Sequence, residues 1–274
     1  MQASHSGPIV LIGAGNMGGA MLGGWLKSGV RGSDVLVIDP GPPPVMAKLI
    51  ADHGVGHATS VPDGVKAGVI FLAVKPQVMD AALPPLRSLV GPETVIISVA
   101  AGKTLAFIER HLGEAAIVRA MPNTPALIGR GVTGAFPNAR VTEAQRVLVH
   151  DLLKVSGPVE WVASEADIDA VTAVSGSGPA YVFYLVECMA EAGRKLGLEA
   201  DLAMRLARET VAGAGELLYQ SSDDAARLRQ NVTSPGGTTA AALGILMADD
   251  GMQPLFNKAI AAARSRAQEL ASSE

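Results

Sequence analysis

Five residues near the N-terminus have the types and spacing of a phosphate-binding turn. Gly13, Gly15 and Gly18 form a G-x-G-x-x-G pattern between an apolar run and a helical stretch. The first glycine permits a tight turn, the second lets the backbone approach a pyrophosphate, and the third lets helix and strand pack closely. N–H groups at the helix start, near Asn16 and Met17, would hold the phosphates of a dinucleotide. A bare glycine-rich turn is the alternative, because the chain has 31 glycines.

Asp39 ends the second predicted strand, where an acidic side chain would accept hydrogen bonds from the adenosine ribose. A 2′-phosphate there would face a like charge, and Lys48 is the nearest cation downstream. The expected cofactor is therefore NAD(P)H, and the acidic residue at this position favours NADH over NADPH. The alternative is that Asp39 only caps the proline-rich turn at 40–44.

Three further segments follow predicted strands and should reach the same edge of a sheet. Ligands of open α/β sheets bind at the carboxyl ends of the strands, so these segments predict contacts with the cofactor. Small residues after the fourth strand would leave room for a flat ring, and Asn123 could donate and accept hydrogen bonds. As isolated loops, each could instead reflect turn chemistry. The residues are Ala73, Val74, Lys75 and Pro76, then Ala100, Ala101 and Gly102, and finally Asn123.

Two loops in the second half of the chain combine small residues and hydroxyls at the start of a predicted helix. They are 175–179 and 234–239. Each would present N–H groups at a helix N-terminus, which suits a small carboxylate. From these residues alone, the chemistry is that of a small anionic substrate reduced by a nicotinamide.

The elements that must position these residues begin with short apolar runs alternating with helical stretches. Continuous apolar runs such as 69–74 and 94–99 indicate strands buried on both faces, as in a parallel sheet. Thr142, with Gln145 three residues later, predicts a capped helix reaching about Val155. Strand–helix alternation predicts an α/β doubly wound fold. The expected strands are 8–12, 34–39, 69–74, 94–99, 117–121, 132–136 and 159–162, and the earlier helices are 16–28 and 45–52.

The pattern changes after about Ser164, where the β-type runs end. Helices are expected at 179–196, 201–219, 225–231, 239–247 and 254–270. The predicted domains are therefore 1–163, which would bind the dinucleotide, and 164–274, all-helical. Because aromatic residues make up only 4% of the chain, these alanine-rich helices would close a core poorly alone. Packing against a second copy predicts a homodimer or higher homo-oligomer.

Composition restricts the partners and the compartment. The net charge is −4 without a basic block, so no nucleic-acid or acidic-membrane partner is expected. The single cysteine, Cys188, fits a reducing compartment and is expected as a small core residue. A signal peptide is not expected at 1–7, the apolar runs are too short to span a bilayer, and the scattered histidines predict no metal site. The protein is expected to be cytoplasmic.

Five motifs in order carry a resemblance to a known family. They are Leu72–Gln77, Ser98–Gly102, Arg119–Pro125, Ala173–Ala180 and Asn231–Thr239. Together they resemble pyrroline-5-carboxylate reductase, and the resemblance extends from about Ile9 to Leu270. It implies a Rossmann-type doubly wound sheet followed by an all-α C-terminal dimerisation domain. It also implies reduction of the cyclic imine 1-pyrroline-5-carboxylate to L-proline with NAD(P)H, the last step of proline biosynthesis.

The same resemblance implies roles for individual residues. The substrate would sit in the loop Ser234–Thr239, near the partner subunit, where N–H groups around Gly236, Gly237 and Thr238 would take its carboxylate. The Thr239 hydroxyl would hydrogen-bond the ring nitrogen, orienting it and relaying a proton. Glu165 matches a family glutamate near the substrate and is expected as a second catalytic residue. The residues expected along the cofactor are Asn231, Lys75, Pro76, Ala100 and Ala101.

Some positions depart from the family pattern, and two other classes of protein compete. Arg229 and Gln230 replace a common Lys-Asp pair, and a serine, Ser222, replaces a common acidic residue. A β-hydroxyacid dehydrogenase would need a catalytic lysine on the long helix, where Lys195 is the only lysine and lies at the far end. A non-catalytic dinucleotide sensor would not need an intact substrate loop. Turnover separates these two classes.

Overall fold

The computed structural model describes residues 7–272, which form two compact units. One contains the described residues up to Gly176 and the C-terminal stretch from Ala263, and the other is Ser177–Ala262. The prediction that no signal peptide begins the chain falls on residues outside the described range, except Gly7. The domain limits 1–163 and 164–274, drawn where strands give way to helices, remain a prediction.

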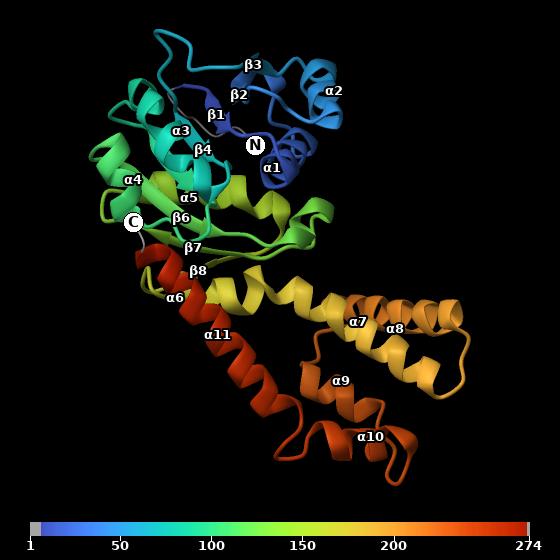
Figure 1. Ribbon diagram of the computed structural model, residues 1–274. Helices are drawn as coiled ribbons and strands as arrows, with labels where there is room; N and C mark the ends of the chain where they lie inside the picture. The colour runs from blue at the N-terminus through green and yellow to red at the C-terminus, as the bar shows by residue number, and fades with distance from the viewer. Residues whose placement is uncertain (1–6, 273–274) are drawn as a thin grey trace. The chain divides into compact units, whose positions relative to one another are not determined.

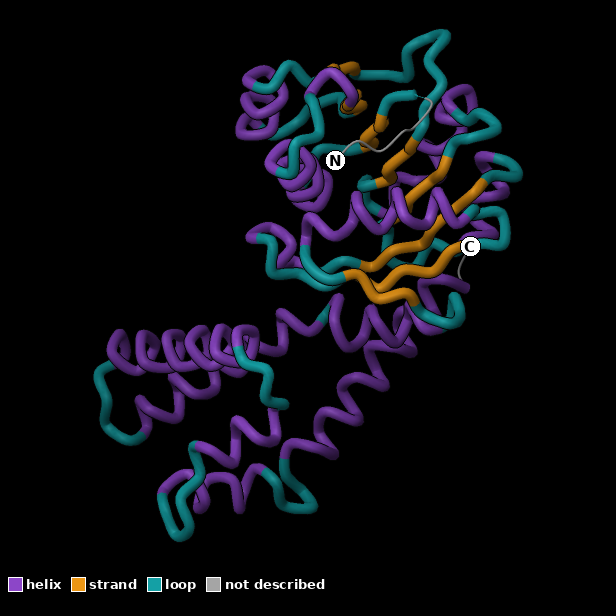
Figure 2. Tube along the Cα trace, turned by 180° about the vertical axis from the view of Figure 1, so that it is seen from behind, coloured by secondary structure: helices purple, strands orange, loops and turns teal. Residues whose placement is uncertain are grey.

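The first unit is built on one sheet, whose described strands follow the order β3-β2-β1-β4-β5-β6-β7-β8 (Figures 1 and 2). Every residue of β1, β4 and β5 is buried, as expected for parallel strands covered on both faces. The predicted α/β fold class is therefore confirmed. The strands are β1 (Ile9–Ile12), β2 (Val35–Ile38), β3 (Gly56–Ala58), β4 (Val69–Leu72), β5 (Val95–Ser98), β6 (Ala116–Met121), β7 (Thr133–Pro137) and β8 (Val159–Trp161).

The direction of the sheet reverses at β7, which the sequence analysis did not anticipate. β7 pairs antiparallel with β6, and β8 pairs parallel with β7. Between β6 and β7 the chain forms only the 3₁₀ turn η4 (Thr124–Ile128). A parallel crossover needs a dozen or more residues, usually including a helix, so the chain returns in the opposite direction.

Helices cover both faces of this sheet and give it two separate cores. α1 (Asn16–Lys27) and α5 (Glu143–Leu153) contribute to one apolar cluster, and α3 (Met79–Leu86) and α4 (Leu105–Leu112) contribute to the other. The fully buried Trp25 lies in the first, where its indole nitrogen donates to the Leu152 carbonyl at 2.8 Å. This tie fixes α1, and with it the glycine-rich turn at its N-terminus.

The remaining elements of this unit are short. The predicted capping box is confirmed, because Thr142 and Gln145 exchange both hydrogen bonds; α5 ends at Leu153, where a 3₁₀ turn replaces the α-helix. The sequence analysis did not identify β3, α3, α4 or α6. Further elements are α2 (Pro44–Asp52), α6 (Asp167–Val171), the π-helical turn η6 (Thr172–Gly176), and 3₁₀ turns η1 (Gly32–Asp34), η2 (Pro76–Val78), η3 (Arg87–Leu89) and η5 (Lys154–Ser156).

The second unit is helical, and α7 and α8 pack against each other (Figure 1). Carboxylates begin two of its helices: Glu199 accepts from the Leu202 N–H, and Asp224 accepts from the Arg227 N–H. Backbone N–H groups of Asp201 and Leu202 lower the pKa of the Glu199 carboxyl. The helices are α7 (Gly178–Lys195), α8 (Ala200–Gln220), α9 (Ala225–Asn231), α10 (Thr238–Leu246) and α11 (Met252–Ser272), whose end belongs to the first unit.

Little of this helical unit is buried by its own chain. Within Ser177–Ala262, the buried hydrophobic side chains are those of Ala190, Ala203 and Ala207. The prediction that Cys188 is a core residue is wrong for the single chain, because Cys188 is exposed on α7. The apolar residues near it in the sequence therefore belong to a surface that the single chain leaves uncovered. Among the described residues, no helix is both long and apolar enough to cross a membrane.

Candidate active site

The turn between β1 and α1 has the geometry that a bound dinucleotide requires. Gly13 has a φ of +90°, and a Cβ on Gly18 would overlap the Gly13 carbonyl oxygen. A Cβ on Gly15 would meet nothing within 4 Å, so the backbone faces open space there. The first turn of α1 carries no acidic side chain, which leaves its N–H groups and positive dipole end for an anion. These residues fit the pyrophosphate of a dinucleotide.

Asp39 reaches this turn from the end of β2. Its Oδ2 accepts a hydrogen bond from the Ala14 N–H at 2.7 Å, and its Oδ1 accepts one from the Gly41 N–H at 2.8 Å. The His57 ring nitrogen Nε2 lies 2.9 Å from the Asp39 carbonyl oxygen. The carboxylate therefore caps the proline-rich turn and also lies beside the glycine-rich turn. The two interpretations of Asp39 are compatible in this geometry.

The segments that follow β4 and β5 lie at the same edge as the glycine-rich turn. Ala73 donates its N–H to the Ile12 carbonyl at 2.9 Å, and a Cβ on Gly18 would lie 3.2 Å from the Ala73 Cβ. Val99 donates to the Leu72 carbonyl at 3.1 Å, which aligns the end of β5 with the end of β4. The strands thus bring together Gly13, Gly15, Gly18, Ala73, Val74, Lys75, Pro76, Ala100, Ala101 and Gly102.

Asn123, after β6, is held by its own chain. Its Nδ2 donates to the Ser175 hydroxyl at 3.3 Å, and its Oδ1 accepts from the Val132 N–H at 3.0 Å. An amide has two donors and two acceptor lone pairs, and these two bonds use one of each. The bond to Ser175 ties the loop after β6 to the π-helical turn η6, a type of turn that occurs often at functional sites.

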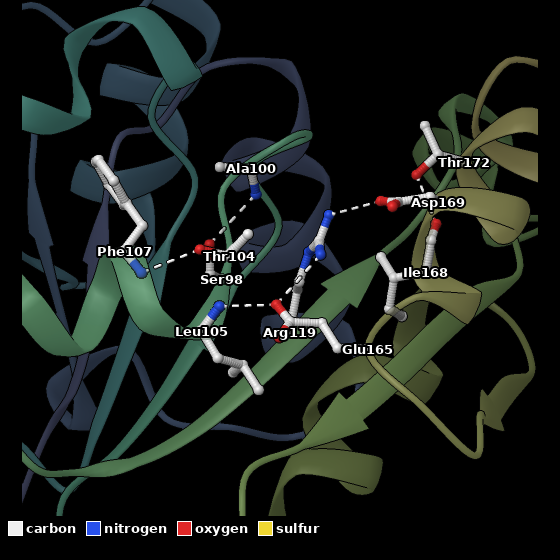
Figure 3. Close-up of polar contacts among 10 residues, drawn as sticks. All are labelled: Ser98, Ala100, Thr104, Leu105, Phe107, Arg119, Glu165, Ile168, Asp169 and Thr172. Atoms are coloured by element: carbon white, nitrogen blue, oxygen red, sulfur yellow. Dashed lines mark hydrogen bonds and ion pairs between the residues drawn. The ribbon is translucent and has the colours of Figure 1, made fainter. Parts of the chain in front are cut away.

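Glu165, 31% exposed, forms part of an ionic cluster around the buried Arg119 beside this edge (Figure 3). Its Oε1 lies 3.2 Å from Nη1 of Arg119, whose Nη2 lies 3.1 Å from Oδ1 of Asp169. The same Oε1 accepts the Leu105 N–H at 2.8 Å. The sequence analysis assigned no role to Arg119 or Asp169. An arginine within the apolar run 116–121 was the available sign, because a buried arginine needs a charged partner.

The predicted substrate loop lies in the helical unit and begins α10. Gly236 has a φ of +71°, and the Gly237 N–H donates to the Ser234 carbonyl at 3.0 Å, which closes the turn. The first turn of α10 carries no acidic side chain, which leaves the N–H groups of Thr238 and Thr239 at the helix start available to an anion. Asn231 ends α9 and is exposed.

Other candidate groups are occupied elsewhere. Lys195, the lysine on the long helix where a β-hydroxyacid dehydrogenase would need a catalytic one, ends α7 with its side chain 71% exposed and pairs with Glu191 at 3.8 Å. Asp224, adjacent to the position where the family commonly has an acidic residue, caps α9. The described residues contain no group of three or more His, Cys, Asp or Glu side chains that could hold a metal ion.

Comparisons with known proteins agree with this arrangement. Residues 165–270 match the family model "Pyrroline-5-carboxylate reductase dimerisation", and residues 8–102 match "NADP oxidoreductase coenzyme F420-dependent". A pyrroline-5-carboxylate reductase from Pseudomonas aeruginosa is 43% identical over 265 residues, covering 96% of each chain. The chain belongs to the pyrroline-5-carboxylate reductase family. This confirms the resemblance on which the sequence analysis relied, and with it an NAD(P)-dependent oxidoreductase.

Solved structures of pyrroline-5-carboxylate reductases have the same fold over nearly the whole chain. The structure from Coxiella burnetii is 36% identical with a TM-score of 0.89, covering 97% of this chain and 98% of its own. The structure from Plasmodium falciparum, with NADP bound, is 27% identical with a TM-score of 0.80, covering 97% and 99%. The expected pairing of a Rossmann-type sheet with a helical dimerisation domain is confirmed.

Proposed function

We propose that this chain reduces 1-pyrroline-5-carboxylate to L-proline, using the glycine-rich turn for the dinucleotide and the start of α10 for the substrate. The observation that carries the proposal is the presence of two open helix N-termini, at α1 and α10, in a member of this family. Each start lacks acidic residues in its first turn, so each is suited to an anion. One anion is a pyrophosphate and the other is the carboxylate of the imine.

The substrate loop supplies binding and orientation. N–H groups around Gly236 and Thr238 take the substrate carboxylate, while Gly237 and Ser234 hold the turn closed through their own hydrogen bond. The Thr239 hydroxyl hydrogen-bonds the ring nitrogen. A bound nicotinamide would supply hydride for the imine carbon, and Thr239 would keep one proton on the ring nitrogen. Positioning two rings can supply a large share of the barrier reduction, so a nucleophile is unnecessary.

In this proposal, most of the remaining cofactor contacts come from the edge of the sheet where the parallel strands end. N–H groups of Asn16 and Met17 hold the pyrophosphate, with Gly13, Gly15 and Gly18 shaping the turn. The segments after β4, β5 and β6 would contact the ribose and nicotinamide. These segments contribute Ala73, Val74, Lys75, Pro76, Ala100, Ala101, Gly102 and Asn123, and Asn231 comes from α9.

The preferred cofactor in this proposal is NADH. The Asp39 carboxylate lies beside the glycine-rich turn, because it accepts a hydrogen bond from the Ala14 N–H. At about 4 Å, a like charge on a 2′-phosphate would cost on the order of 1–4 kcal/mol, from bulk water to a protein surface. The carboxylate would instead accept hydrogen bonds from a free ribose hydroxyl.

The proposed assembly is a cytoplasmic homodimer or a higher homo-oligomer, without nucleic acid or membrane. Residues 165–270 match the dimerisation domain of the family, and most apolar side chains of the helical unit are exposed in a single chain. A single cysteine supports a reducing compartment.

The test is the absorbance at 340 nm with purified protein, 1-pyrroline-5-carboxylate, and NADH or NADPH in turn. Rapid loss of absorbance with formation of L-proline is expected, at higher kcat/KM with NADH. Fluorescence titration measures binding of each cofactor without substrate. Cofactor binding without turnover of this imine would contradict the assigned substrate and favour the sensor class.

A further inference from the structure

Arg119 is the centre of an ionic cluster that the proposed chemistry does not use. It lies on β6, with 2% of its side chain exposed, and its Nε has no hydrogen-bond partner among the described residues. Its two terminal nitrogens face carboxylates from one helical segment: Glu165 just before α6, and Asp169 within it (Figure 3). The cluster holds one positive group and two negative groups, so removing Arg119 would leave both carboxylates without their cation.

The Glu165 carboxylate joins this cluster to the loop after β5. Its Oε1 accepts the N–H of Leu105, the first residue of α4. Thr104 caps the same helix by accepting the Phe107 N–H at 3.0 Å. Two side chains thus satisfy N–H groups that a helix start leaves without intrahelical partners. Because Lys103 and Thr104 alone separate Ala100–Gly102 from this start, Glu165 holds the far end of the loop predicted to contact the nicotinamide.

The ion pair between Arg119 and Asp169 connects the cluster to the loop after β6, at the same edge of the sheet. Asp169 is tied to Arg119, and α6 continues directly into the π-helical turn η6. In that turn, Ser175 accepts the hydrogen bond from Asn123, which follows β6. The cluster therefore connects the loop after β5, the loop after β6 and η6. All three connections lie within the sheet unit.

We propose that Glu165 and Arg119 are positioning residues that fix the loop after β5 for the cofactor, and that Glu165 is not a proton donor to the substrate. This rests on the proposed function, but it changes the role expected for Glu165. Its Oε1 accepts hydrogen bonds from two donors of the protein, the guanidinium and the Leu105 N–H, which are the contacts of a group that holds a loop in place. A group placed to protonate the imine would instead need an oxygen within hydrogen-bond reach of the substrate nitrogen.

The first pair of variants separates positioning from proton transfer. Glu165→Ala removes the acceptor, whereas Glu165→Gln keeps an oxygen that Leu105 and Arg119 can both use. NADH affinity is measured without substrate, by fluorescence titration, beside kcat and KM. We expect Glu165→Ala to raise the NADH dissociation constant about tenfold, since small misplacements are costly, and Glu165→Gln to restore it to within about threefold. Asp167→Ala is the matched control, because the Asp167 carboxylate accepts from the N–H and hydroxyl of nearby Ser164 and lies outside the cluster.

A second pair tests the contact without changing the carboxylate. Leu105→Pro removes the donated N–H at the first helical position, where proline is tolerated, and Thr104 already has the extended backbone that proline prefers before it. Leu105→Ala keeps the N–H and controls for the lost side chain. We expect Leu105→Pro to raise the NADH dissociation constant by about the same factor as Glu165→Ala, and the double variant to add little more.

These measurements give opposite outcomes for the two roles. If Glu165→Gln loses as much kcat as Glu165→Ala, with NADH affinity unchanged in both, Glu165 is a catalytic group and the proposal is wrong. If Glu165→Ala does not fold, the Leu105 pair decides, because equal affinities in Leu105→Pro and Leu105→Ala would also overturn it. Failure of the proposed activity is seen separately, as absent turnover by the unmodified protein with normal NADH binding.

Discussion

The sheet unit and the helical unit solve the problem of burying apolar surface in different ways. In the sheet unit, two clusters of aliphatic and aromatic side chains close completely around β1, β4 and β5. In Ser177–Ala262, three alanines are the buried hydrophobic side chains, while Phe183 and Tyr219 on long helices are 63% and 64% exposed. Monomers rarely leave so many large apolar groups on contiguous helices.

This difference assigns separate sources of stability to the two units. The sheet unit has a core of its own, whereas the helical unit leaves its apolar helices exposed and matches a dimerisation domain, so we expect a second copy to cover them. The proposed chemistry divides in the same way: the cofactor residues lie mostly on the rigid sheet, and the substrate loop begins a helix of the other unit. Substitutions should therefore have effects that differ by unit.

The largest expected effect is on the stability of the sheet unit. Trp25→Ala removes a fully buried ring that contacts Phe71 at 5.2 Å between centroids and donates to Leu152. We expect a loss of about 3–5 kcal/mol in the free energy of unfolding, measured by urea denaturation at fixed protein concentration. Trp161→Ala, at a half-buried position, is the control and should cost less. Equal losses would mean that the core is not concentrated around α1.

The next effect is on chemistry and originates in the helical unit. Thr239→Ala should lower kcat/KM about a hundredfold by removing the hydroxyl that orients the ring nitrogen, while the NADH dissociation constant changes by less than about twofold. Thr239→Ser keeps a hydroxyl and should retain most activity. Steady-state kinetics and fluorescence titration measure the two quantities. Unchanged turnover in Thr239→Ala would remove this residue from the mechanism.

Introducing a charge on the exposed surface of either unit tests whether the helical unit forms the proposed interface between two copies of the chain. Phe183→Asp places a carboxylate among the exposed apolar groups of α7 and should raise the dissociation constant of the dimer by about tenfold or more. Val147→Asp makes the same change on α5 of the sheet unit, at a side chain that is also exposed, and should leave association intact. Light scattering across a dilution series measures both. Dissociation in neither variant would mean that α7 does not form the interface.

Strong local patterns were sufficient to predict many of these elements. The strand from Ile9 and the helix from Asn16 were located from an apolar run and a glycine pattern, and the start of α5 from its capping box. The strand β3 was missed because Gly56–Ala58 is short, exposed and poor in β-branched residues. The helix α3 was missed because Pro84 and Pro85 lie inside it, where they ordinarily argue against a helix.

The candidate site shows where one-dimensional patterns end. The glycine spacing is local, so the shape of the turn after β1 could be predicted. The contact of Glu165 with Leu105 joins residues 60 positions apart and involves a backbone N–H, which no side-chain pattern records. The exposure of Cys188 was mispredicted for a related reason, since apolar neighbours do not distinguish a core from a surface that a second chain covers.

The smallest expected effect concerns the choice of cofactor and arises in the sheet unit alone. Asp39→Ser removes the negative charge beside the glycine-rich turn and should shift the ratio of NADPH to NADH dissociation constants about tenfold towards NADPH. Loss of the hydrogen bonds from Ala14 and Gly41 would weaken the binding of both cofactors, so the ratio of their dissociation constants is the decisive quantity. Asp34→Ser, which removes a carboxylate paired with Arg31, is the matched control. If the ratio does not move in Asp39→Ser, Asp39 only ties the two turns together, and the preference must originate elsewhere along the edge of the sheet.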